Sequence, residues 1–344
     1  MGVKISADST CDLSQALIDA YQIGITPLYI VMQNQTYMDG VEITREELFR
    51  KVAETGKIGS TAAVNVEDYE KFFAEAKKTH DGVVHFTISS DMSSCYQNAC
   101  IAARDFENVY VVDSRNLSSG IGHLAVDAAI MAENGATAEE IFRAMEEKKS
   151  RLDVSFVINT LEFLKMGGRC SSLAALGANM LGLKPCIEVR DGKMSVCKKY
   201  RGHLERCLQK YVADRLSEPD TIEPSRIFIT DSGVPDEMVK MVEEEIRKHV
   251  AFDEIIHTLS LIHIYRAAKL CAVLRACARP ENRTLQIGVF AGKSVFAEHA
   301  VRADSRAGGN LRALRDQARG FENRRRVDAC ARKNDRSVAA GEPV

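Results

Sequence analysis

The sequence lacks the features that would direct this chain of 344 residues into a membrane or out of the cell. No apolar run approaches the roughly 20 residues that a membrane-spanning helix needs. The N-terminus has no apolar stretch long enough for a signal peptide. Ten cysteines are present, but no two form a Cys-x-x-Cys pair, which argues against a zinc site or a redox motif. We therefore expect a cytoplasmic protein whose cysteines are reduced and mostly buried.

The motifs of the common nucleotide-dependent and covalent enzymes are also missing. The sequence has no Gly-x-x-x-x-Gly-Lys-Ser/Thr phosphate loop and no Gly-x-Ser-x-Gly nucleophile elbow. No Gly-x-Gly-x-x-Gly follows the first predicted strand, and the histidines show no metal-ligand spacing. Hydroxyl side chains without a neighbouring base favour binding over covalent catalysis. We expect no catalytic residue, no metal and no cofactor.

Charge divides the chain into two unequal parts. Residues 1–258 carry 29 Lys and Arg against 40 Asp and Glu, a net charge of −11. Residues 259–344 carry 17 against 8, a net charge of +9, and are rich in Arg and Ala. The segment Leu259 to Ile264 is what CTG-TCT-CTT-ATA-CAC-ATC encodes, the transposon-end adapter of sequencing libraries. We interpret residues 259–344 as a non-native, chimeric tail and expect no nucleic-acid partner; a native basic tail is the alternative.

Short apolar runs alternate with helical patterns through residues 3–258, which is typical of βαβ units. Strands are expected at 3–7, 25–31, 83–88 and 109–112. The dipeptide Asp191-Gly192 lies between apolar runs and predicts a β-hairpin. We predict an α/β fold of two domains. Residues 1–152 would form a mostly parallel sheet with flanking helices, and residues 153–258 a mixed sheet with helices, truncated at its C-terminal end.

Hydroxyl side chains follow three expected strands of the first half. They lie in the segments Asp8-Ser9-Thr10, Thr87-Ile88-Ser89-Ser90 and Asp113-Ser114. Ligands of open parallel sheets bind beyond the carboxyl ends of the strands, where helix N-termini attract anions. Ser, Thr and Asp are also the preferred helix N-caps, so any one of these side chains is explained by capping alone. Together they predict an anion site at this sheet edge.

These segments resemble the DegV family of fatty-acid-binding proteins. The matching segments follow one another in the order and at the spacing of the family, and they cover nearly all of residues 1–258. They are Asp8-Ser9-Thr10-Cys11-Asp12-Leu13, Ser89 to Ala99, Val112-Asp113-Ser114 with Ser119-Gly120-Ile121-Gly122, Leu164 to Arg169, and Leu183-Lys184-Pro185. The resemblance implies a two-domain fold that holds a long-chain fatty acid between the domains.

The resemblance also implies which residues bind the ligand. Thr61 and Ser93 correspond to the hydroxyls that bind the carboxylate. The expected ligand-binding set is completed by Ser9, Ser119, Arg169 and Arg201, the two arginines resembling basic residues near the opening. Ala62 replaces a frequent Ser, and Ser94 and Cys95 replace the usual Gly and Thr. The family's Gly-rich, His-containing segment after residue 258 has no counterpart here.

A complete family member of this kind resembles the acyl-carrying subunit of bacterial fatty acid kinase. By that resemblance the chain is no enzyme itself. Its partners would be a long-chain fatty acid and a separate ATP-dependent kinase subunit, which forms an acyl phosphate for phospholipid synthesis, with transient proximity to the membrane. The alternative is an α/β enzyme that acts on a small anionic metabolite at the same sheet edge.

Overall fold

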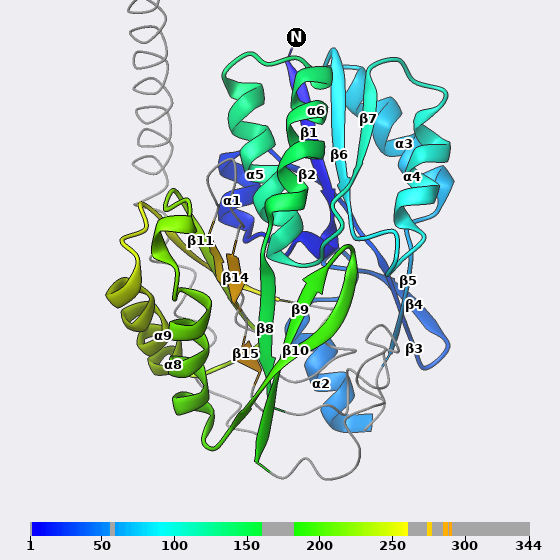
Figure 1. Ribbon diagram of the computed structural model, residues 1–344. Coiled ribbons are helices and arrows are strands. Elements are labelled where there is room, and N and C mark those ends of the chain that lie inside the picture. The colour runs from blue at the N-terminus through cyan, green and yellow to red at the C-terminus, as the bar shows by residue number, and fades with distance from the viewer. Residues whose placement is uncertain are drawn as a thin grey trace, which may run out of the picture.

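The first sheet of the molecule is fully parallel. The computed structural model describes residues 2–55, 59–159 and 182–260, with 274–276, 285–287 and 289–290. In spatial order the sheet contains β2 (Gly24–Thr26), β1 (Val3–Asp8), β6 (Gly82–Thr87) and β7 (Val109–Asp113) (Figure 1). Every residue of β6 is buried, so both faces of the sheet are covered. The predicted parallel sheet of the first half is therefore confirmed.

Helices pack on this sheet in two pairs. These are α3 (Val66–Lys77) with α4 (Cys95–Ala103), and α5 (Ser119–Glu133) with α6 (Ala138–Lys148) (Figure 1). The short α1 (Gln15–Ala20) and α2 (Arg45–Thr55) precede them in the chain. Thr44 and Thr137 begin α2 and α6 with a capping box, in which the carboxylates of Glu47 and Glu140 accept a hydrogen bond from the backbone N–H of the cap residue.

A small antiparallel sheet was not predicted. The expected single strand at 25–31 is two strands in different sheets, because Pro27 lies between β2 and β3 (Tyr29–Met32) and has no N–H for a ladder bond. β3 pairs on one side with β4 (Gln35–Met38) and on the other with β5 (Ser60–Ala62). Thr61, an expected ligand residue, is thus placed at the edge of this sheet.

A long hairpin dominates the second sheet. β9 (Leu183–Arg190) and β10 (Lys193–Arg201) are joined by the turn Asp191-Gly192, as predicted. β8 (Val154–Ile158) pairs antiparallel with β9 and parallel with β15 (Val289–Phe290), so the sheet is mixed. One irregularity interrupts the hairpin between Val196 and Lys198.

The remaining described elements pack beside this sheet. They are α8 (Leu204–Arg215), β11 (Ile227–Asp231), α9 (Asp236–His249), β12 (Ile255–Leu259), and the pair β13 (Leu274–Ala276) and β14 (Leu285–Ile287). The sequence pattern also predicts helices through Leu164 and over 173–181, and these segments lie outside the described residues. No helix in the described ranges is long and apolar enough to span a bilayer.

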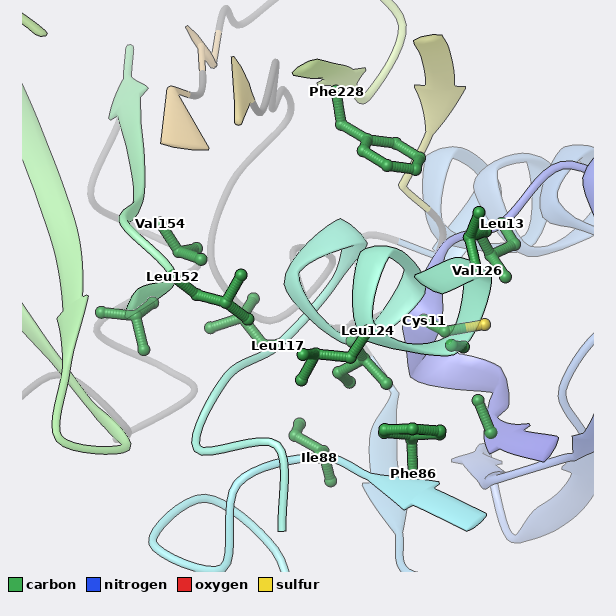
Figure 2. Close-up of a cluster of buried hydrophobic side chains, with 14 of the residues drawn as sticks. Cys11, Leu13, Phe86, Ile88, Leu117, Leu124, Val126, Leu152, Val154 and Phe228 are labelled. Carbon is green, nitrogen blue, oxygen red and sulfur yellow. The ribbon is translucent and has the colours of Figure 1, made fainter. Parts of the chain in front are cut away.

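Helix α5 lies at the centre of the apolar core. Figure 2 shows Leu124 and Val126 of this helix between Phe86 of the first sheet and Phe228 of β11. Val154 of β8 belongs to the same buried cluster, so one core extends from the parallel sheet into the second half of the chain. The apolar core continues across residue 152 and so marks no boundary there. The predicted division into two domains at this residue stays a prediction.

Candidate functional site

Asp8 occupies the end of the first strand and is fully buried. Its Oδ1 accepts hydrogen bonds from the hydroxyl of Tyr69 at 2.7 Å and of Thr26 at 3.1 Å, and its Oδ2 accepts from the backbone N–H of Ile88 at 3.1 Å. His85 lies beside it, 3.3 Å from Oδ1. A buried carboxyl with this many partners is held in place by the protein and joins β1, β6 and α3. It is a structural group at the sheet edge.

Ser9 is bound to its own chain. Its hydroxyl donates to Oδ2 of Asp39 at 2.6 Å and accepts from the backbone N–H of Leu28 at 3.1 Å. Asp39 is only 4% exposed. Burial raises the pKa of Asp39 to about 6, although the hydrogen bond from Ser9 favours the charged form. With both its donor and an acceptor lone pair occupied, Ser9 has little capacity left for a ligand, and its predicted role stays a prediction.

The second and third strand ends form a docking surface for the hairpin. Ser89 donates to the carbonyl of Gly192 at 2.8 Å, and Ser90 donates to Asp113 at 2.5 Å. Arg115 donates to the carbonyl of Asp191, and its ion pair with Asp91 measures 2.6 Å. Ser89 and Arg115 therefore hold the Asp191-Gly192 turn against the parallel sheet, and Ser90 accepts a hydrogen bond from Arg115. The anion site expected from three hydroxyl-rich strand ends stays a prediction, since most of these groups already have protein partners.

Ser119 lies in a buried hydroxyl row between α5 and the paired strands β11 and β12. Its hydroxyl is 2.7 Å from that of Thr230, which is 2.8 Å from that of Thr258. Next to this row, Ser118 and Ser260 both donate to Oδ2 of Asp12. Ser119 is fully buried. Its hydrogen bond with Thr230 couples the N-terminus of α5 to the second half of the chain. Leu259 and Ser260, placed in the tail by the sequence, complete β12 and this contact.

Ser93 differs from these hydroxyls in its partners. It lies two residues before α4, is half-buried, and accepts from the backbone N–H of Cys95 at 3.3 Å. Its own proton is directed to the Cys95 sulfur at 3.2 Å. Sulfur is a weak acceptor. The Ser93 O–H is therefore easily redirected to a stronger acceptor such as a carboxylate oxygen.

Thr61 reaches the Ser93 region through the segment that follows β5. The carbonyl of Val64 accepts from the Asn98 side chain of α4 at 2.7 Å, and a backbone hydrogen bond from Val64 also favours the thiolate form of Cys95. The segments that carry Thr61 and Ser93 are thus in contact. Thr61 is half-buried, and its hydroxyl makes no hydrogen bond to another described residue.

The two predicted arginines have different outcomes. Arg201 is exposed at the end of β10, opposite Leu183, and makes no ion pair within the described part of the chain. Arg169 lies outside the described residues. Among the described residues, no group of three or more His, Cys, Asp or Glu side chains is arranged to hold a metal ion. The roles of both arginines stay predictions.

Sequence reasoning missed several polar residues that shape the site. The pattern over residues 66–78 predicts an amphipathic helix with Tyr69 on its apolar side, yet the Tyr69 hydroxyl reaches Asp8. Asp39 follows an unpredicted strand, and Asn98 lies on an unpredicted helix. Their partners are distant in the sequence, so no local spacing indicates these contacts.

Comparisons with known proteins agree with this architecture. The family model for uncharacterised proteins of the DegV family matches residues 2–273, which extends past the junction expected after Thr258. A DegV domain-containing protein of Clostridium perfringens is 32% identical over 250 residues, covering 71% of this chain and 84% of the relative. A fatty acid-binding protein of Thermotoga maritima is 29% identical over 271 residues, covering 76% and 93%.

Solved structures show the same fold. One is a DegV family protein of Thermus thermophilus whose structure is described as showing fatty acid binding. It has a TM-score of 0.74 and 26% identity to this chain, and the match covers 81% of this chain and all of that one. A stearic acid-binding protein of Eubacterium ventriosum has a TM-score of 0.68 and 25% identity, covering 81% and 99%. The family match over most of the chain, together with this fold, shows that the protein belongs to the DegV family.

Proposed function

We propose that this protein binds one long-chain fatty acid, whose carboxylate accepts hydrogen bonds from Thr61 and Ser93. The supporting observation is a difference among the predicted hydroxyls. Ser9 and Ser119 are hydrogen-bonded to oxygen atoms of the protein, whereas the Ser93 proton has only a sulfur acceptor. The Thr61 hydroxyl has no hydrogen-bond partner among the described residues. Two adjacent segments thus offer donors to an incoming carboxylate.

The energetics favour a carrier in which the tail supplies affinity and the hydroxyls supply orientation. A sixteen-carbon tail at about 0.8 kcal/mol per buried CH₂ offers on the order of 12 kcal/mol before the costs of association. Each hydrogen bond to the charged carboxylate adds roughly 1.5–3 kcal/mol. The related proteins from Thermus thermophilus and Eubacterium ventriosum, which bind fatty acids, support this assignment.

The proposal extends to a partner. We propose that a separate ATP-dependent kinase subunit phosphorylates the bound carboxylate; the resemblance to the acyl-carrying subunit of fatty acid kinase supports this, and the lack of a phosphate loop in this sequence is consistent with it. In this proposed role the protein is a cytoplasmic carrier that presents the acyl group. The roles proposed for Arg169 and Arg201 rest on their resemblance to basic residues near the opening in the family. A pull-down with the purified kinase subunit, in the presence and absence of fatty acid, tests this part by itself.

Organic extraction of the purified, folded chain tests the carrier function. We expect roughly one fatty acid per chain by mass spectrometry, in line with a single acyl site. Thr61→Val and Ser93→Ala should retain less fatty acid, whereas Ser217→Ala, at an exposed hydroxyl that bonds only to Asp214 among the described residues, should match the wild type. Folded protein that binds no fatty acid, even after incubation with palmitate, contradicts the proposal.

One observation favours the alternative of an enzyme at the sheet edge. Asp39 is a buried carboxyl hydrogen-bonded to the Ser9 hydroxyl, an arrangement that could serve as a base and a nucleophile. Turnover of a small anionic metabolite by the chain alone, lost in Ser9→Ala and retained in Ser93→Ala, would support that function. We favour the carrier, because Asp39 is almost fully covered and the Ser9 oxygen also accepts from Leu28.

A further inference from the structure

Two cysteines face each other across the long hairpin. With Asp191-Gly192 as a two-residue turn, an uninterrupted ladder would pair Cys186 of β9 directly with Cys197 of β10. The bulge shifts the ladder by one residue, so Val196 pairs with Ile187 and Lys198 pairs with Cys186. Cys197 is the extra residue of the bulge. Cys197 and Lys198 on β10 therefore both lie opposite Cys186 on β9.

The Cys197 thiol contacts Cys186. It donates to the backbone carbonyl of Cys186 at 3.4 Å, and the Cys186 side chain favours the thiolate form of Cys197. The Cys186 thiol itself is directed to the carbonyl of Ile187 at 4.0 Å. Facing Cα atoms of antiparallel strands are about 4.5–5.5 Å apart, within the roughly 4.4–6.8 Å that a disulfide spans. Both cysteines are unpaired thiols in this structure.

Their surroundings give the two thiols different properties. Cys197 is exposed, whereas Cys186 is 1% exposed. The hydrogen bond from Cys186 lowers the pKa of the Cys197 thiol; burial opposes this shift, and the charge of Arg215 adds to it. Burial raises the pKa of the Cys186 thiol. Cys197 is therefore the better nucleophile, and Cys186 is the neighbour that can resolve its oxidised form.

We propose that Cys186 and Cys197 form a reversible dithiol–disulfide site whose oxidant is a hydroperoxide. The Cys197 thiolate attacks the distal peroxide oxygen, the O–O bond breaks, and the alkoxide leaves and takes a proton as an alcohol. The sulfenic acid on Cys197 is then attacked by the Cys186 sulfur, which forms the S–S bond and releases water. In sum, two thiols and one hydroperoxide give one disulfide, one alcohol and one water.

The other described cysteines lack this combination of properties. Burial raises the pKa of both Cys11 and Cys95 to about 12. It also raises the pKa of Cys100 and of Cys207. Among the cysteines that the structure describes, Cys197 is the one that is both exposed and activated.

Peptide mapping of the full chain tests the site. The reduced protein is treated with hydrogen peroxide, the remaining thiols are blocked, and the protein is digested with trypsin, which cuts after Arg190 and Lys193. Cys186 and Cys197 then lie on separate peptides that stay joined only by a disulfide. We expect this linked pair, the loss of two thiols per chain, and full recovery of both thiols with dithiothreitol.

Two variants separate this chemistry from general oxidation. Cys197→Ser should abolish the linked pair, whereas Cys100→Ser, a control at a half-buried cysteine, should form it as the wild type does. Cys186→Ser, which keeps a hydroxyl donor beside Cys197 but cannot form the disulfide, should accumulate a sulfenic acid on Cys197 that a cyclic dione traps. The inference is overturned if the oxidised wild type yields no Cys186–Cys197 link, or if Cys197 proceeds to the sulfinic acid with Cys186 still reduced.

Discussion

The hydroxyl of Tyr69 on α3 donates a hydrogen bond to Oδ1 of Asp8, at the end of β1, over 2.7 Å. Tyr69 also contacts the Cys95 thiol, which in turn accepts from Ser93. A continuous polar contact therefore leads from a fully buried carboxyl to the proposed ligand donor. This path ties the position of Ser93 to the packing of α3 on the parallel sheet.

Removal of the Tyr69 hydroxyl should destabilise the protein. In Tyr69→Phe the buried Asp8 loses one donor, which we expect to lower the free energy of unfolding by about 1–3 kcal/mol. Tyr110→Phe is the matched control, because the half-buried Tyr110 ring stacks on Phe142 and should lose less than about 0.5 kcal/mol. Denaturant unfolding measures both changes. Equal stability of the two variants would contradict the importance of the Asp8 contact.

Asp39 should make stability depend on pH. Its pKa in the folded protein is about 6, above its ordinary value of 3.8, so the folded state binds more protons between these values. The contribution of Asp39 to the free energy of unfolding should therefore be greatest below about pH 4. It should fall by on the order of 3 kcal/mol as pH rises through 6. Urea unfolding between pH 4 and 7 measures the slope.

Asp39→Asn should remove this part of the pH dependence. The amide oxygen still accepts from Ser9, and no charge is buried at pH 7. We expect the variant to be at least as stable as the wild type at pH 7 and to show a flatter profile. Asp253→Asn, at an exposed position, should keep the wild-type profile. An unchanged slope in Asp39→Asn would show that this carboxyl does not titrate as described.

Gly192 should be required for the hairpin to dock. It has φ of +81°, and a Cβ there would lie 2.6 Å from Ser89 Oγ and 2.6 Å from Arg115 Cζ. Gly135 has a similar φ of +84° with nothing within 4 Å of its Cβ position. Gly135→Ala therefore measures backbone strain alone, about 1 kcal/mol. Gly192→Ala should cost more and should expose the turn to faster amide hydrogen exchange. An equal cost would show that the contact is dispensable.

The sequence predicted elements with strong local signals and missed those without them. The segments Thr44-Arg45-Glu46-Glu47 and Thr137-Ala138-Glu139-Glu140 are capping-box patterns that predict helix starts, and Asp191-Gly192 predicts a hairpin turn. All three signals are local, and the structure contains all three features. Helix α5 was not predicted, because its residues from Ser119 to Val126 are all buried and leave no polar stripe to give a helical period. Strands β4 and β5 have only four and three residues, too few for a clear alternation.

The site shows the same distinction. The hydroxyl-rich strand ends do lie near one sheet edge, as parallel strands require. A hydroxyl can donate to a ligand only if its O–H is not already bonded to the protein. The partners that decide this lie far along the chain, such as Asp39 for Ser9 and Thr230 for Ser119. Local spacing contains no information about those partners. The facing cysteines were accessible from the sequence, since a two-residue turn at 191–192 fixes the register.

The most direct test of the central claim compares palmitate with hexadecanol, which share a tail and differ in the head group. Isothermal titration of the full chain should show that the wild type prefers palmitate, and that Ser93→Ala weakens palmitate binding by roughly 10-fold or more with little change for hexadecanol. This result would assign the carboxylate to Ser93. Equal affinity of the wild type for both lipids, or an equal loss for both in Ser93→Ala, would contradict the account.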